Sequence, residues 1–330
     1  MKVLVIGATG FVGMHLVPQL LLNGYSVTCL VRAPDRIIQL SFKNEVSFII
    51  GDITDPTSLV FDNDFTYVIH LAALGHVSAI SNESYNEFVN VNEIGTRNLI
   101  NALIGCKTLK LFIHFSSTAA MGPNLSPILS EKSTPNPRTP YQLSKYKSEL
   151  VSLDAFSNVS FPVIILRPCM IYGIGGKGEF LRFCKLMNKG IFPKVGNGSN
   201  LTPIVHVNDV VNATLLAMIN AKAGNTYIIA SANSYPLDVI RKYVVDCIDK
   251  PIPYIYVPVW VAMLGSTFFE LMYRFVNKAP IVTRANIRST VTNRTFDISK
   301  AINELGYKPE VSLYDGINNT VKWYIDNNLL

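Results

Sequence analysis

The chain of 330 residues is 49% hydrophobic and 16% charged, a composition that excludes intrinsic disorder, and its length indicates roughly two domains. Its net charge of +6 comes from 29 basic and 23 acidic residues. Because the basic residues are scattered singly and form no runs, the composition does not indicate a nucleic-acid partner.

The first half of the chain alternates short, apolar, β-branched runs with segments of helical periodicity. Runs that are apolar almost throughout are typical of strands buried on both faces, and their alternation with helices is typical of βαβ units. We therefore predict an α/β fold in which helices cover both faces of a doubly wound parallel sheet. The strands are predicted at 3–6, 26–31, 46–50, 67–71, 111–115 and 163–166.

The regular alternation fades after Pro168, where glycine-rich stretches at 173–178 and 196–198 interrupt the pattern. We expect a smaller, mostly C-terminal α/β domain there that binds a substrate. Residues 204–230 regain a strand-helix-strand pattern and are expected to return to the sheet. The predicted domains are 1–168 with 203–230, and 169–202 with 231–330.

Cysteine usage and the N-terminus both favour a cytoplasmic protein. The five cysteines are odd in number and far apart, and their spacing indicates neither a disulfide framework nor a zinc site, so we predict no bound metal. The first apolar run leads directly into a glycine turn, and it is too short for a secretory signal.

A glycine-rich loop follows the first predicted strand and opens a predicted helix. Its glycines permit a tight turn and close approach of the backbone to a pyrophosphate, whose negative charge the N–H groups of the helix start stabilise. An ordinary strand-to-helix turn is the alternative. The candidate cofactor residues here are Gly7, Thr9, Gly10, Phe11, Val12 and Gly13.

The end of the second strand indicates which dinucleotide binds. Where an acidic residue would accept the ribose 2′-hydroxyl of NAD, the chain has Arg32, with Arg36 one helical turn on. A guanidinium pairs with a 2′-phosphate, so these residues favour NADP over NAD, although a solvated arginine is the alternative. Asp52, which follows the third strand, is either an acceptor for the adenine amino group or a helix N-cap.

Tyr141 and Lys145 lie four residues apart, which places them on one face if their segment is helical. An ammonium near the phenol is expected to lower its pKa towards neutral pH and make Tyr141 a usable general acid or base. The fifth predicted strand ends just before Ser116 and Ser117. These hydroxyls therefore lie at the carboxyl end of the sheet, where open α/β folds bind ligands.

Eight motifs together resemble the extended short-chain dehydrogenase/reductase superfamily, also called the NAD-dependent epimerase/dehydratase family. The resemblance covers nearly the whole chain and implies a Rossmann fold with a bound nicotinamide dinucleotide. The motifs are GATGFVG at 7–13, GD at 51–52, HLAA at 70–73, NxxGTxNL at 92–99, SS at 116–117, YxxxK at 141–145, LRPxxIYG at 166–173 and VHVxD at 205–209.

The resemblance implies a Ser-Tyr-Lys triad. Ser117 would hydrogen-bond the reacting oxygen, Tyr141 would transfer its proton, and Lys145 would also hold the nicotinamide ribose while a hydride moves to or from nicotinamide C4. Asn92 would support the Lys145 end, His206 is expected to be structural, and a homodimer through two helices of the first domain is implied. Further implied cofactor residues are Ile53, Leu71, Ala72, Ala73, Asn92, Ser116 and Pro168.

Three departures narrow the choice within the family. Thr118 and Ala119 stand where sugar-nucleotide dehydratases have an Asp-Glu pair, so dehydration is not expected. Thr202 replaces the arginine with which epimerases hold a diphosphate, although Arg284 or Arg288 could still bind one. The apolar pair at 169–170 replaces an Asn typical of epimerases.

The C-terminal half resembles instead the 3β-hydroxysteroid dehydrogenase and dihydroflavonol-reductase-like branch, through SSxxxxGPN at 116–124 and NRTFDISKAxxxLGYxP at 293–309. Met121 replaces the tyrosine usual there in epimerases, which removes a polar contact near the substrate. Residues 251–269 carry no charge, and three interpretations stay open for them: a core helix, a lid over an apolar substrate, or a patch on a membrane surface.

We therefore expect an NAD(P)-dependent oxidoreductase that acts on a secondary alcohol or ketone of an apolar substrate, such as a sterol-like, terpenoid or flavonoid-like molecule. The alternative is a nucleotide-sugar 4-epimerase or reductase with the same triad. A third hypothesis is a non-catalytic cofactor sensor or scaffold. It is disfavoured because such proteins commonly lose the Tyr or the Lys, and this chain has both.

Overall fold

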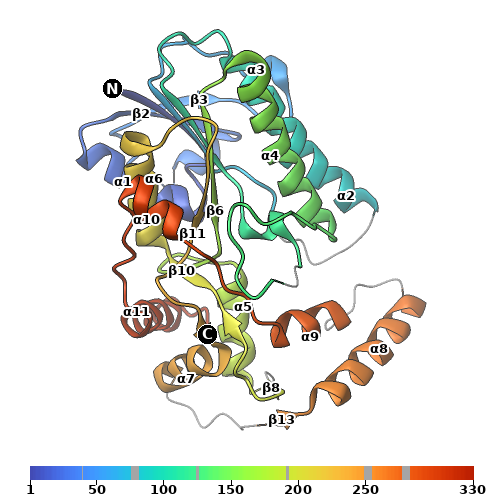
Figure 1. Ribbon diagram of the computed structural model, residues 1–330. Helices are drawn as coiled ribbons and strands as arrows, with labels where there is room; N and C mark the ends of the chain where they lie inside the picture. Colours follow the sequence, from blue (N-terminus) through green and yellow to red (C-terminus); the bar gives the residue numbers. More distant parts are fainter. Residues whose placement is uncertain (39, 76–81, 124–125, 191–192, 249–254, 277–282) are drawn as a thin grey trace.

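Seven parallel strands form the central sheet of the computed structural model, which describes all residues except 39, 76–81, 124–125, 191–192, 249–254 and 277–282 (Figure 1). Their order is β11-β6-β5-β4-β1-β2-β3. The six predicted strands are confirmed to within two residues at each end, and the seventh comes from residues 204–230, as expected. The strands are β1 (Lys2–Ile6), β2 (Ser26–Val31), β3 (Ser47–Ile50), β4 (Tyr67–His70), β5 (Leu111–Phe115), β6 (Val163–Pro168) and β11 (Thr226–Ile229).

Helices cover both faces of this sheet, which confirms the doubly wound architecture (Figure 1). The two faces carry separate clusters of buried side chains, because each strand is apolar on both sides. One face is covered by α1 (Phe11–Leu22), α6 (Val207–Asn220) and α10 (Ser299–Leu305). The other is covered by α2 (Asn82–Phe88), the π-helical segment η3 (Val89–Ile94), α3 (Gly95–Leu103) and α4 (Pro140–Val159).

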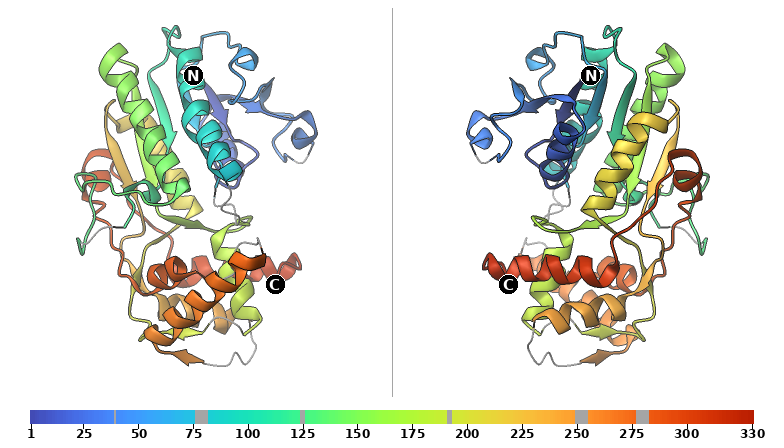
Figure 2. Two further views of the ribbon diagram at one scale, coloured as in Figure 1. Left: turned by 90° about the vertical axis from the view of Figure 1, so that its right-hand side faces the viewer. Right: turned by 90° about the vertical axis from the view of Figure 1, so that its left-hand side faces the viewer.

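A second layer, mostly helical, lies beyond the carboxyl ends of the strands (Figures 1 and 2). Its core is a third cluster of buried side chains around Tyr172 and Tyr324. This layer contains α5 (Glu179–Asn188), α7 (Leu237–Ile248) and α11 (Leu313–Asp326). Its two-stranded sheets pair β7 (Met170–Tyr172) with β10 (Ile204–His206), β8 (Lys194–Val195) with β13 (Tyr256–Val257), and β9 (Leu201–Thr202) with β12 (Tyr235–Pro236). The domain boundaries inferred from the sequence stay a prediction.

The uncharged segment 251–269 leads into α8 (Val259–Val276), which packs against α9 (Arg284–Val291) at the edge of the second layer (Figure 2). Several of its large apolar side chains, Trp260 and Phe268 among them, are exposed. The interpretation as a core helix is therefore wrong for the described part of the segment, and residues 251–254 lie outside the described residues. Within the described chain, no helix combines the length and hydrophobicity that crossing a membrane requires.

Three residues that the sequence analysis placed at or near chemistry belong to the core or have a structural role. Met121 is completely buried and Cys169 is nearly so, both in the cluster on one face of the sheet, so the expected effect of Met121 on substrate contacts is wrong. His206 is the N-cap of α6, accepting from the backbone N of Asn208 at 3.2 Å, as its predicted structural role requires. All five cysteines have free thiols.

Candidate active site

The loop between β1 and α1 forms a cradle that only glycine can line. Gly7 has a φ of +91°, and a Cβ there would lie 2.7 Å from the backbone N of Ala72. A Cβ on Gly13 would lie 2.5 Å from the carbonyl oxygen of Gly7. Gly10 is the N-cap of α1 and has no side chain that could accept a hydrogen bond from the helix start. The first backbone N–H groups of α1 can therefore donate to a bound anion. The cradle therefore fits a pyrophosphate.

The remaining residues of this loop meet the second layer. The Phe11 ring lies against Gly176, where a Cβ would approach the ring to 3.0 Å. One turn further on, His15 Nε2 is hydrogen-bonded to the carbonyl oxygen of Ile174 at 2.8 Å. The glycine-rich stretch 173–178 thus packs against the start of α1 and connects the cradle with α5. Thr9 lies in the loop just before α1, and Val12 is the second residue of this helix.

Arg32 and Arg36 both lie exposed after β2, Arg36 within the short 3₁₀ helix Pro34–Ile37. They are thus free to approach a ligand, as NADP binding requires. Asp52 Oδ1 accepts from the backbone N of Thr54 at 2.9 Å and from its hydroxyl at 2.8 Å. The N-cap of the following 3₁₀ helix is Asp55, so the N-cap alternative for Asp52 is wrong.

The other predicted cofactor residues follow the carboxyl ends of neighbouring strands, so the sheet brings them to one edge. Among them, the Ser116 hydroxyl is buried and has no hydrogen-bond partner within the described part of the chain. These residues are Ile53 after β3, Leu71, Ala72 and Ala73 after β4, Ser116 after β5, and Pro168 as the last residue of β6.

The helix that carries Tyr141 and Lys145 begins at a sharply defined position. Its N-cap is Thr139, whose side chain accepts from the backbone N of Gln142 at 3.3 Å, while the Gln142 side chain accepts from the backbone N of Thr139. Pro140 occupies the first helical position, where its missing N–H costs nothing. Tyr141 therefore lies in the first turn and Lys145 one turn further on, as their spacing predicted.

The Tyr141 phenol meets Ser117 near the end of β5. Ser117 is the N-cap of the 3₁₀ helix Thr118–Met121, and its Oγ accepts from the backbone N of Ala119 at 3.1 Å. Burial raises the pKa of Tyr141 to about 12, the charge of Glu179 adds to this, and a hydrogen bond with the Ser117 side chain opposes it. The expectation that Lys145 lowers the pKa of this phenol is wrong here, because burial dominates.

Lys145 is an almost completely buried ammonium. Its Nζ donates to the carbonyl oxygen of Phe115, the last residue of β5, at 2.7 Å. Burial lowers the pKa of Lys145 to about 8, against the opposing charge of Glu149. Burial and this same ammonium lower the pKa of His70 to about 3 and that of His114 well below its usual value. The two stacked imidazoles beneath the site are thus neutral at physiological pH.

Asn92 connects the site to the end of β4. Its Nδ2 donates to Ser144 Oγ at 2.9 Å and to the carbonyl oxygen of Leu74 at 3.2 Å, while its Oδ1 accepts from the backbone N of Leu74 at 2.8 Å. It lies in the π-helical segment η3, whose wide turn is uncommon and is found frequently at functional sites. Asn92 thus holds α4, next to Lys145, and the chain after Ala73 in one arrangement.

Two charged residues were not among the predicted site residues: one lies near Tyr141, and the other lies near that first residue. Glu179, the first residue of α5, lies near enough for its charge to raise the pKa of Tyr141. Desolvation by the surrounding protein lowers the pKa of Arg294, and the negative charge of Glu179 opposes this shift. The Arg294 residue is nevertheless exposed to solvent. Neither residue has a sequence signal for this placement, because both come from the second layer and reach the site only through tertiary packing.

Thr202, which replaces the arginine of epimerases, and the two arginines proposed to hold a diphosphate come from different elements. Thr202 lies in β9, whereas Arg284 lies in α9, where its Nε donates to Glu270 Oε2 at 2.7 Å, and Arg288 is one turn further on. Glu270 belongs to α8, so this ion pair connects the two peripheral helices.

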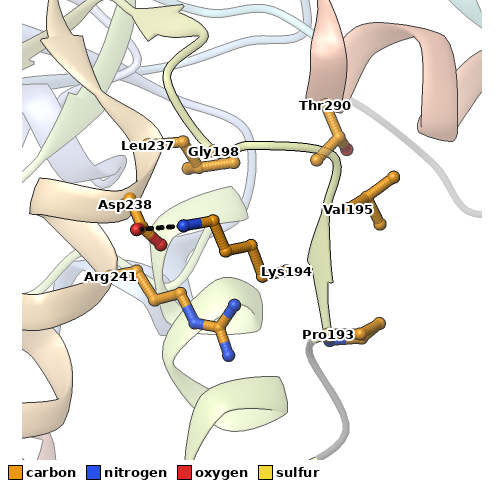
Figure 3. A pocket seen from close by; sticks show the side chains of 8 residues that line it. All are labelled: Pro193, Lys194, Val195, Gly198, Leu237, Asp238, Arg241 and Thr290. Carbon is orange, nitrogen blue, oxygen red and sulfur yellow. Dashed lines mark hydrogen bonds and ion pairs between the residues drawn. The ribbon is translucent and has the colours of Figure 1, made fainter. Parts of the chain in front are cut away.

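Two pockets lie in the second layer. The first is a narrow space between β8 and α7, in which Lys194 is ion-paired with Asp238 at 2.7 Å and Arg241 lies alongside (Figure 3). The second is larger, about 500 Å³, and lies between the loop after β8 and the ends of α8 and α9. Polar side chains make up half of its lining, which consists of Val195, Gly196, Asn197, Ser199, Asn200, Val259, Val291 and Asn293.

Comparison with known proteins matches residues 3–230 to the NAD dependent epimerase/dehydratase family. The chain is 28% identical to the UDP-glucose 4-epimerase of Vibrio cholerae, over 99% of this chain and 96% of that protein. It is 26% identical to the decarboxylating sterol-4-alpha-carboxylate 3-dehydrogenase of Saccharomyces cerevisiae, over 98% and 97%. The crystal structure of UDP-glucuronic acid 4-epimerase from Bacillus cereus in complex with NAD superposes with a TM-score of 0.78, at 25% identity and 99% coverage of both chains.

Proposed function

Because this chain belongs to the NAD-dependent epimerase/dehydratase family, and is an enzyme of the extended short-chain dehydrogenase/reductase type, we propose a hydride transfer between nicotinamide and a secondary alcohol or its ketone. The observation that carries the proposal is the hydrogen bond between the half-buried Tyr141 phenol and Ser117, one helical turn from the buried ammonium of Lys145. This arrangement places a proton donor beside a second hydroxyl that holds the reacting oxygen.

The protonation states favour Tyr141 as a general acid. With its pKa raised to about 12, the phenol keeps its proton at neutral pH and donates it to the oxygen of a ketone during reduction. Ser117 hydrogen-bonds the same oxygen and stabilises the negative charge that develops on it. The reverse reaction needs the phenolate, so alcohol oxidation should become faster as the pH rises.

The glycine cradle and the buried Ser116 hydroxyl fit a dinucleotide between the carboxyl ends of the strands and the second layer. When bound, NAD or NADP supplies or accepts the hydride. The cradle around Gly7 and Gly13 would hold the pyrophosphate, and Lys145 would hold the nicotinamide ribose. Arg32 favours NADP by charge, and its exposed position is consistent with this.

Of the two substrate classes, we place the nucleotide sugar first, because 4-epimerases of nucleotide sugars are among the proteins that this chain resembles. The 500 Å³ pocket of the second layer shares no lining residue with the triad, but its amide side chains at Asn197, Asn200 and Asn293 would suit a hydrogen-bonding group of such a substrate more than an apolar ring. Since Met121 and Cys169 belong to the core, their apolar character no longer argues against this class.

An apolar substrate is the second candidate. Thr202 still stands where epimerases have an arginine, and the exposed apolar side chains of α8 offer a lid or contact surface of the kind that a sterol-like substrate would need. The cytoplasmic location, the homodimer and the absence of a metal expected from the sequence stay predictions.

One assay separates these candidates. Absorbance of the reduced nicotinamide is followed with NAD and NADP separately, with UDP- and dTDP-sugars, their 4-keto forms, 3-hydroxysteroids and flavanols in parallel. Oxidation of reduced cofactor by a 4-keto sugar, or epimerisation of a sugar without net cofactor change, supports the nucleotide-sugar proposal. Turnover of the steroids or flavanols alone would overturn it.

The triad has its own test. Tyr141→Phe should lower turnover by at least about a hundredfold, because the general acid is lost, while the dissociation constant for the cofactor stays within about twofold. Tyr146→Phe, one turn further along the same helix, is the matched control and should leave turnover unchanged. Full activity of Tyr141→Phe would remove this phenol from the mechanism.

A further inference from the structure

The outer face of α8 carries a continuous stripe of exposed apolar side chains. Trp260, Leu264, Phe268 and Leu271 are 67%, 64%, 66% and 53% exposed. At 3.6 residues per turn these four positions fall within an arc of about 80° on the helix. Ser266, which is 2% exposed, lies on the opposite side, so the helix presents this stripe outward. Such an apolar stripe indicates an interaction surface rather than ordinary scattered exposure.

The charge around the stripe identifies the partner that suits it. Among the described side chains of α8 and α9, two arginines, Arg284 and Arg288, lie near one carboxylate, Glu270, so positive charge is in excess there. On α9, which packs against α8, Arg284 and Arg288 are both exposed; Arg284 is ion-paired with Glu270, and the charge of Arg288 also acts on that carboxylate. An apolar stripe with cations beside it is the pattern of a helix that lies in the surface of a negatively charged bilayer.

We propose that α8 rests on an anionic phospholipid surface, with the stripe of Trp260, Leu264, Phe268 and Leu271 among the lipids and the arginines of α9 at the headgroups. None of these residues belongs to the triad of Ser117, Tyr141 and Lys145, so the inference does not depend on the proposed hydride transfer. Trp260 suits the role, since tryptophan prefers the boundary between headgroups and acyl chains. The result is a peripheral protein whose second layer faces the membrane.

The two tryptophans of the chain make a direct test possible. In Trp323→Phe, Trp260 is the sole indole, and its emission reports where α8 lies. Adding phosphatidylcholine vesicles with about one third phosphatidylglycerol should shift this emission to shorter wavelength and sediment the protein, whereas pure phosphatidylcholine vesicles should do so far less. High salt should weaken the binding, because it screens the arginines.

Two sets of variants distinguish binding through the stripe from nonspecific hydrophobic adsorption. Leu264→Ser, Phe268→Ser and Leu271→Ser combined should weaken vesicle binding at least about tenfold. The matched control combines Leu22→Ser, Val60→Ser and Ile219→Ser, which are 78%, 76% and 71% exposed on other elements, and should leave binding unchanged. Arg288→Gln should weaken it about fivefold. Circular dichroism checks that each variant is folded.

Three results would overturn the proposal. These are no binding to anionic vesicles, equal binding to neutral vesicles, and equal loss of binding in the control. Sedimentation velocity tests the alternative that a second copy of the chain binds to the stripe. A dimer that dissociates only in the stripe variant, without any vesicle binding, would assign this face to self-association instead.

Discussion

The buried ammonium of Lys145 makes the cofactor-free enzyme less stable than it would be with an apolar side chain there. Burial lowers the pKa of Lys145 from 10.5 to about 8, so the charged form costs about 3 kcal/mol of folding free energy at neutral pH. Lys145→Met keeps the unbranched shape and removes the charge. It also leaves the carbonyl oxygen of Phe115 without its donor, a loss of about 1 kcal/mol. We therefore expect the variant to be inactive yet about 2 kcal/mol more stable at pH 7.

The size of this effect depends on pH within a defined window. Below about pH 8 the folded and unfolded states both hold the Lys145 proton, and the cost is fully present. Between about pH 8 and 10.5 the folded state releases the proton first, so the wild type gains stability and the advantage of Lys145→Met disappears.

Urea unfolding of the cofactor-free proteins, followed by circular dichroism at about pH 7 and pH 10, measures both effects. Lys147→Met is the matched control, because Lys147 lies on the same helix with 39% of its side chain exposed, and its stability should change by less than about 0.5 kcal/mol. If Lys145→Met is less stable than the wild type at pH 7, and the difference does not vary with pH, the reasoning about the buried charge is refuted.

Three further predictions concern the cofactor loop, the cofactor preference and a buried ion pair. Gly13→Ala should weaken NAD binding at least about tenfold in calorimetry, because its Cβ would collide with the loop backbone. Gly105→Ala is the control and should leave binding unchanged, because the space around its Cβ is open. Equal affinities of the two variants would contradict the role of the glycine loop in cofactor binding. Arg32→Ser should weaken NADP binding about tenfold and leave NAD binding unchanged in fluorescence titrations, and a parallel loss of both would exclude 2′-phosphate recognition. Glu149→Gln should destabilise the protein by about 3 to 5 kcal/mol in urea, because it breaks the buried bidentate pair with Arg167, and a cost below about 1 kcal/mol would show that the pair contributes little.

Local patterns were enough to predict the sheet. The strand at 111–115 has the predicted bounds because its apolar, β-branched run is bordered by polar residues, and β11 was recovered from the strand-helix-strand pattern of 204–230. The glycine loop and the Tyr141 to Lys145 spacing were likewise readable, since each depends on residues close together in the chain.

What depended on tertiary packing was not predictable. The pKa of Tyr141 is set by burial and by Glu179, which belongs to a different layer, so the spacing of Tyr141 and Lys145 could not reveal its direction. Met121 was assigned to the substrate side because its place in a motif carries no information on which way its side chain points. The exposure of α8 fits two of the three interpretations that the sequence left open, and the sequence could not choose among the three, because an apolar run looks the same whether its partner is the core or a surface outside the chain.

The π-helical segment η3 changes the direction in which the helix after it presents its side chains. A π turn takes in one residue more than an α turn, so the parts of the helix before and after it are rotated by about 100° relative to an uninterrupted α-helix. This rotation lets Leu99 and Leu103 of α3 pack into the buried cluster on the sheet while Asn92 faces Leu74 and Ser144. Deletion of a single residue from η3 would bring back the α-helical phase, and α3 could then keep its packing or Asn92 its hydrogen bonds, but not both.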